Sequence, residues 1–232
     1  SPTVVMEIGL VGPLEEWAAV QPKVARFARV VSYDRIGAKY TDSVLTGRAI
    51  AADLHAALAN AHLPPPYVLV GQSFAGIYNR IFASMYPTEV VGMVLLDPAQ
   101  EQFIEWMQIH HPEEEFSKQQ HRNWPEAGGV LPTLDELASC GPLPDVPVVV
   151  VTCARPGHDL LRTEILPVWT AMHNNWVQSL PNGRHVITTK SGHGVQVEQP
   201  ELVVDLIREV VEAARRGTNG HLANEESTGG SP

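Results

Sequence analysis

The stretch YVLVGQSFAG, residues Tyr67–Gly76, decides how the chain folds. Its first four residues are apolar or β-branched and predict a buried strand, and the residues after Gly76 predict a helix. Between them stands Ser73, with small residues at Gly71 and Ala75 that let strand and helix meet at a sharp turn. Such a pattern also occurs by chance in tight turns, but the flanking strand and helix favour catalysis. We therefore predict that Ser73 is a nucleophile whose hydroxyl stands clear of the backbone.

Short apolar runs alternate with longer amphipathic ones along the rest of the chain. Val146–Thr152 contains four consecutive valines, and Val90–Leu96 shows little alternation of apolar and polar residues. Strands of this kind are buried on both faces, and helical patterns between them indicate a parallel sheet. We predict an α/β fold with a mostly parallel sheet of about six strands and helices on both faces. The expected strands are Thr3–Ile8, Arg29–Tyr33, Tyr67–Val70, Val90–Leu96, Val146–Thr152 and Arg184–Thr189.

Two segments depart from this alternation. Residues 98–146 are too long for a plain loop, so we expect a small helical cap inserted between two core segments, 1–97 and 147–216. Residues 217–232 are rich in Gly, Ser, Asn and Glu and predict a disordered tail.

The composition excludes several classes of partner. The chain has 232 residues, a net charge of −10 and no long run of Lys or Arg, so we expect no nucleic-acid partner. No apolar run is long enough to span a bilayer, so we expect no membrane insertion. The first residues lack the charged and apolar regions of a secretion signal, which favours a cytoplasmic location and leaves a removed signal open.

Further segments resemble the α/β-hydrolase superfamily, in the order in which that family has them. The resemblance covers about residues 3–216 and implies the hydrolase fold, a serine esterase-like activity and no cofactor. Three features depart from the family: the two strands that usually precede its third strand are absent here, Gln72 stands where His is common, and the usual glycine-rich turn after Gly37 reads Ala38-Lys39-Tyr40. The matching segments are Val4–Leu10 (third strand and oxyanion loop), Tyr33–Gly37 (the next turn), Pro66–Phe74 (the nucleophile turn), Val91–Pro98 (sixth strand) and Ser191–His193 (histidine loop).

The resemblance also suggests partners for Ser73. His193 follows an expected strand, lies between two glycines and gives the order Ser…Asp…His, so we predict that it is the base. The acid has two candidates. Asp97 lies at the end of the sixth family strand, and Asp159 follows the seventh, after which most members carry the acid, but it comes three residues later than usual. Some branches use the earlier position, so we favour Asp97, although an Asp before Pro also suits a helix cap. The backbone N–H groups of Phe74 and Leu10 are the implied oxyanion hole.

The expected cap contains apolar residues at Phe103, Trp106 and Met107, which we predict to line a substrate pocket. Their spacing fits the buried face of one cap helix equally well. The pair His110 and His111 has no third ligand at suitable spacing, so we predict no metal site.

The sequence therefore predicts a serine hydrolase that cleaves a small carboxylic ester with a short or medium acyl group or an aryl group. Amides, thioesters, lactones or a carbon–carbon bond are alternative substrates for the same residues, and a ligand receptor without turnover is another. Because Arg29–Tyr33 would lie at a sheet edge, we expect either a monomer or an edge-mediated homodimer.

Overall fold

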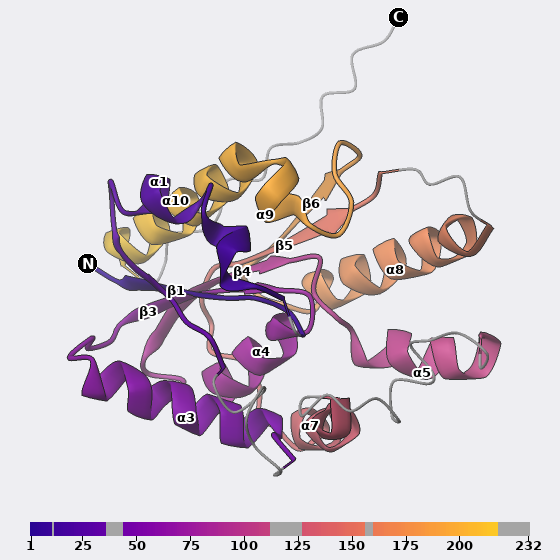
Figure 1. Ribbon diagram of the computed structural model, residues 1–232, viewed down its shortest axis with the longest axis horizontal. Helices are drawn as coiled ribbons and strands as arrows, with labels where there is room; N and C mark the ends of the chain where they lie inside the picture. The colour runs from indigo at the N-terminus through magenta and orange to yellow at the C-terminus, as the bar shows by residue number, and fades with distance from the viewer. Residues whose placement is uncertain (11, 36–43, 112–126, 156–159, 218–232) are drawn as a thin grey trace, which may run out of the picture.

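The computed structural model describes residues 1–10, 12–35, 44–111, 127–155 and 160–217, and its centre is a six-stranded sheet (Figure 1). All neighbouring strands run parallel, in the order β2-β1-β3-β4-β5-β6, so the predicted fold class is confirmed. The strand predicted to lie at an edge is β2, which pairs with β1. The strands are β1 Thr3–Glu7, β2 Arg29–Ser32, β3 Tyr67–Gln72, β4 Val90–Leu96, β5 Val148–Cys153 and β6 Gly183–Thr188.

Helices cover both faces of the sheet, as the buried strands require (Figure 1). Successive side chains of β3 alternate between two cores: Leu69 packs with the helices on one face, while Val68 and Val70 pack with those on the other. The first core draws on α3 Gly47–Asn60, α4 Ala75–Met85, α5 Glu101–His110, α7 Val130–Ala138 and α8 Leu160–Gln178. The second draws on η1 Leu14–Trp17, α1 Gln21–Val24, α9 Val195–Glu198 and α10 Pro200–Arg216.

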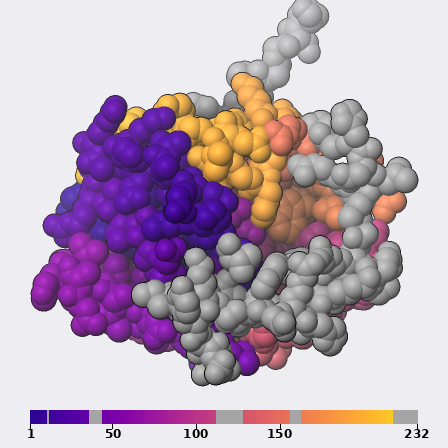
Figure 2. All heavy atoms as spheres, in the orientation of Figure 1, coloured from indigo at the N-terminus to yellow at the C-terminus, as the bar shows by residue number. Residues whose placement is uncertain are grey.

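The beginning and the end of the chain lie side by side. Helix α1 contacts α10, and η1 contacts α9, so indigo and yellow atoms adjoin on the face drawn in Figure 2. The second core is thus built from segments almost the whole chain apart, including Trp17 and Ile207, both fully buried.

The described part of the segment expected to form a cap contains the helices α5 and α7. Helix α5 packs against α8, and α7, which follows a short 3-10 turn η3 at Ala127–Gly129, packs against α3 and α4. Residues 112–126 of the expected cap, and the expected tail beyond Gly217, lie outside the described residues. Within the described part of the chain, no helix has the length and apolar character needed to cross a membrane.

Parallel strands place all their carboxyl ends at one edge of the sheet, where ligands of open α/β sheets bind. The residues that follow β1, β3, β4 and β5 therefore converge there. These strand ends carry Gly9, Ser73, Asp97 and Cys153.

Candidate active site

Ser73 occupies the sharp turn between β3 and α4. Its φ is +57°, in the left-handed region that residues with a side chain seldom adopt. The neighbouring turn is equally tight, because a Cβ on Gly71 would stand 2.5 Å from Asn79 Oδ1 and 2.9 Å from the Ala75 carbonyl oxygen. Only glycine fits at that position, which explains the small residue that the sequence shows before Ser73.

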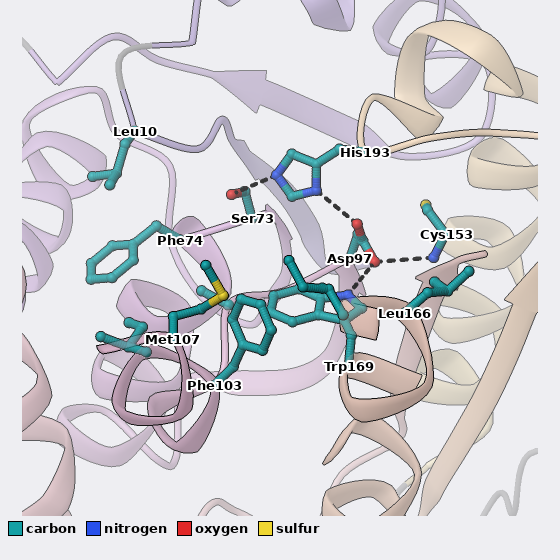
Figure 3. A pocket seen from close by; sticks show the side chains of 13 residues that line it. Leu10, Ser73, Phe74, Asp97, Phe103, Met107, Cys153, Leu166, Trp169 and His193 are labelled. Carbon is teal, nitrogen blue, oxygen red and sulfur yellow. Dashed lines mark hydrogen bonds and ion pairs between the residues drawn. The ribbon is translucent and has the colours of Figure 1, made fainter. Parts of the chain in front are cut away.

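A row of hydrogen bonds joins Ser73, His193 and Asp97 (Figure 3). His193 Nδ1 lies 2.7 Å from Asp97 Oδ2, and His193 Nε2 lies 2.9 Å from Ser73 Oγ. An ionised carboxylate only accepts, so Nδ1 carries the proton of the neutral ring and Nε2 accepts from the hydroxyl. The ring is thereby in the tautomer that can take a proton from Ser73.

Asp97 is held in place from several directions. Its side chain is 7% exposed, its φ is +46°, and its Oδ1 accepts from the Cys153 backbone N–H at 3.0 Å and from Trp169 Nε1–H at 2.8 Å. Burial alone would raise the pKa of Asp97. The hydrogen bond and charge of His193, with the two other donors, outweigh burial and lower this pKa below its ordinary value. Asp97 is therefore a carboxylate at neutral pH.

The structure brings together the side chains of Ser73, His193 and Asp97, the three residues named from the sequence as candidates. The other candidate acid, Asp159, lies outside the described residues. Strand β5, after which most of the family carries the acid, ends at Cys153. The backbone N–H of Cys153 donates a hydrogen bond to Asp97.

Gln72 joins two loops around Ser73. Its Oε1 accepts from the Gly9 N–H at 3.2 Å, and its Nε2 donates to the His193 carbonyl oxygen at 3.1 Å. Arg35 holds the Gly9 loop from the opposite side, because its guanidinium donates to the carbonyl oxygens of Ile8 and Gly9 at 2.7 Å each. The loop that carries Leu10 is thus fixed by its backbone.

A buried carboxylate, Glu7, anchors Arg35. Glu7 is 1% exposed and accepts from Tyr33 Oη at 2.6 Å, Asn79 Nδ2 at 2.9 Å and Arg35 at 3.1 Å. Burial and the nearby Glu7 charge raise the pKa of Tyr33, so its hydroxyl stays a donor. A buried charge needs such partners, and this set ties the end of β1 to the residues that follow β2 and to α4.

A pocket of about 340 Å³ opens beside Ser73 Oγ (Figure 3). Phe103 and Met107 line it together with Leu10 and Phe74. Trp106 is not among the described residues of its wall; its ring stacks on Phe103 instead, with the ring centroids 5.9 Å apart. The other lining residues are Ser73, Asp97, Ala99, Ile104, Cys153, Ile165, Leu166, Trp169 and His193.

A family model described as alpha/beta hydrolase fold matches residues 2–152. The chain belongs to this family. Among solved structures, this family member is similar to an enol-lactonase from Burkholderia xenovorans LB400 (14% identity, 91% of this chain and 92% of that one, TM-score 0.64). It is also similar to a thermophilic esterase from Thermogutta terrifontis (20% identity, 92% of this chain and 90% of that one, TM-score 0.61) and to a carboxylesterase from Bacillus subtilis (17% identity, 91% and 84%, TM-score 0.55).

Two curated relatives also match this α/β-hydrolase, and both are uncharacterized proteins. One, from Schizosaccharomyces pombe, is 33% identical over 81 residues, which is 34% of this chain and 15% of that protein. The other, from Bacillus subtilis, is 28% identical over 100 residues, which is 42% of this chain and 40% of that protein. The matched stretches thus span less than half the length of either relative.

Several residues of the site were not predicted from the sequence, among them Trp169, Arg35 and, in its bridging role, Gln72. Gln72 stood out only as a departure from the usual His. Trp169 carries no local signal, since a Trp in an amphipathic helix usually packs in a core.

Proposed function

We propose that this α/β-hydrolase cleaves carboxylic esters through an acyl-enzyme on Ser73. The observation that carries the proposal is the hydrogen-bonded row Ser73–His193–Asp97 at the wall of an apolar pocket. The row has the three parts that serine hydrolysis needs: a nucleophile, a base within hydrogen-bond reach and an acid that orients the base.

In the proposed reaction, Ser73 Oγ attacks the ester carbonyl carbon while His193 Nε2 takes the hydroxyl proton. Asp97 holds the imidazole and stabilises the imidazolium that forms. The backbone N–H groups of Phe74 and Leu10 donate to the oxyanion, and the N-terminus of α4 favours its negative charge. His193 then gives its proton to the leaving alcohol, and a water molecule, activated by the same base, releases the acid.

The pocket suggests the acyl group. Apart from the three residues of the row, its described lining is apolar or aromatic, with one buried thiol, and its size suits a short or medium acyl chain or an aryl group. A charged acyl group would lose its hydration there without a partner. Similarity to an enol-lactonase adds a second candidate, a lactone, which is a cyclic ester and needs the same steps.

A series of p-nitrophenyl esters from acetate to laurate tests the proposal. We expect turnover that peaks at a short or medium chain, disappears in Ser73→Ala and falls about ten-thousand-fold in Asp97→Asn, as in other triads. Negligible turnover of every ester and lactone by the folded protein would contradict it, and ligand-induced stabilisation without turnover would favour a receptor.

A further inference from the structure

We propose that Trp169 is a positioning residue for Asp97: its indole N–H orients the carboxylate, while its ring forms part of the pocket wall. This inference rests on the proposed function, because it assigns Asp97 to the hydrolytic row. The side chain of Trp169 thus connects the pocket with the residue that orients the base (Figure 3).

The carboxylate of Asp97 has two oxygens with separate tasks. Oδ2 meets His193 Nδ1 at 2.7 Å, and donors to Oδ1 hold the other side of the carboxylate, so that it presents Oδ2 to the imidazole. Oδ1 has two donors, the Cys153 N–H at 3.0 Å and Trp169 Nε1–H at 2.8 Å. The first belongs to the sheet backbone, so Trp169 is the side chain that completes the orientation.

Helix α8 makes a second contact with the same turn, one helical turn after Trp169. His173 Nε2–H donates to the Pro98 carbonyl oxygen at 2.8 Å. Residues four apart lie on one helix face, so α8 presents both donors side by side. Asp97 has a positive φ, and such a backbone persists only where its surroundings hold it. The helix therefore holds both the carboxylate and the chain that follows it.

The hydrogen-bonding direction at His173 is determined by its partners. The Pro98 oxygen can only accept, so Nε2 bears the proton, and burial lowers the pKa of His173 and keeps its ring neutral. Its Nδ1 must then accept from the Thr152 hydroxyl at 2.7 Å, and Thr152 in turn accepts from His185 Nε2–H at 2.6 Å. These hydrogen bonds therefore connect β6 with the turn that contains Asp97 and Pro98.

The ring of Trp169 is packed so that its N–H cannot easily turn away. Phe103 meets it edge-on, with the ring centroids 4.5 Å apart, and the His173 ring lies 4.8 Å away on the same helix. The titratable groups around the Asp97–Trp169 contact are His193 from the loop after β6, the Cys153 thiol from β5, and His173, with His185 behind it.

The test is Trp169→Phe, which keeps an aromatic ring in the pocket wall and removes the N–H. We expect kcat for the best p-nitrophenyl ester to fall about tenfold, the effect of losing one hydrogen bond to a charged group. The carboxylate, with one donor fewer, should hold the imidazolium proton more strongly. The acid limb of the kcat/KM profile should therefore move to higher pH.

A second readout does not need turnover. The His193 Nδ1–H proton shared with Asp97 gives a downfield NMR signal, which we expect to shift or broaden in Trp169→Phe. Trp176→Phe is the matched control: Trp176 lies on the same helix but packs under Arg80, 4.5 Å from the guanidinium carbon to the ring centroid. It should leave both the NMR signal and the acid limb unchanged.

An unchanged NMR signal in Trp169→Phe, with an unchanged kcat and acid limb, would overturn the inference even if the melting temperature falls. If the unaltered protein turns over no ester, the proposed function fails, but the NMR comparison still decides whether Trp169 orients Asp97. The two failures are therefore distinguishable.

Discussion

The loop at Gly9 leaves no room for even one methyl group, and Gly9→Ala should therefore disable the site. A Cβ built on Gly9 would stand 2.7 Å from Gln72 Oε1 and 2.8 Å from Ser73 Cβ. Neither neighbour can yield freely: Gln72 is bonded to two loops, and Ser73 sits at a strained φ of +57°. The loop carrying Leu10 must move away from the nucleophile instead.

The expected effect on turnover exceeds the effect on stability. An extra methyl group in a packed site usually destabilises a protein by about 1–3 kcal/mol. Displacement of one oxyanion donor lowers kcat by about a hundred- to a thousand-fold. Since Gly9 contributes no side chain to substrate binding, KM should change much less than kcat.

The assay is steady-state hydrolysis of the best p-nitrophenyl ester, with thermal unfolding measured in parallel. Gly194→Ala is the control, because Gly194 adjoins His193 and its Cβ would have no atom within 4 Å. The same substitution should there leave kcat nearly unchanged. The reasoning is refuted if the kcat of Gly9→Ala stays within a factor of about three of that of the unaltered protein. Such a change is far smaller than the loss expected when one oxyanion donor is displaced.

Further outcomes follow from the buried hydrogen bonds. Gln72→Glu can still accept from Gly9 but cannot donate to the His193 carbonyl, so kcat should fall about tenfold, and Gln72→Leu, which loses both bonds, should fall further. Equal activity of both variants and the unaltered protein would contradict this bridge. Burial, and then the nearby His173, lower the pKa of His185 from 6.5 to about 4, so unfolding takes up a proton between these pH values. Stability should therefore drop by roughly 2 kcal/mol as the pH falls through that window, allowing for partial exposure. In His185→Gln, the melting temperature should depend less on pH across this window. A drop in stability as large as that of the unaltered protein would show that His185 is not its cause.

The fold could be predicted because its signals are local. The valine run of β5 and the strand–Ser73–helix pattern each lie within a few residues. A strand that is buried on both faces also has a nearly continuous run of apolar residues, which can be recognised in the sequence. The turn at Ser73 was predictable for the same reason, since steric crowding at Gly71 dictates the small residue. The segment between β1 and β2 is divided into the short helices η1 and α1, with Pro22 inside the first turn of α1.

The supports of the site could not be predicted, because they join residues that only the fold brings together. Trp169 and Asp97 are 72 positions apart, and Gln72 and His193 are 121 positions apart. The donor from Cys153 is a backbone group, so no side chain in the sequence could have indicated it. For such contacts the sequence offers the residue type but not the partner.

The position of Asp97 has a structural explanation in the register of the sheet. Leu96 pairs with Val151 in the β4–β5 ladder, so the two strands end side by side, and neighbouring strands lie only about 4.8 Å apart. A carboxylate at the end of either strand can therefore approach the same imidazole. In this chain the backbone N–H of Cys153, the last residue of β5, donates to the carboxylate at the end of β4. Asp97 also receives a donor from outside the sheet, Trp169 Nε1–H of α8, and under the proposed mechanism this bond lets an acid at the end of β4 keep its orientation.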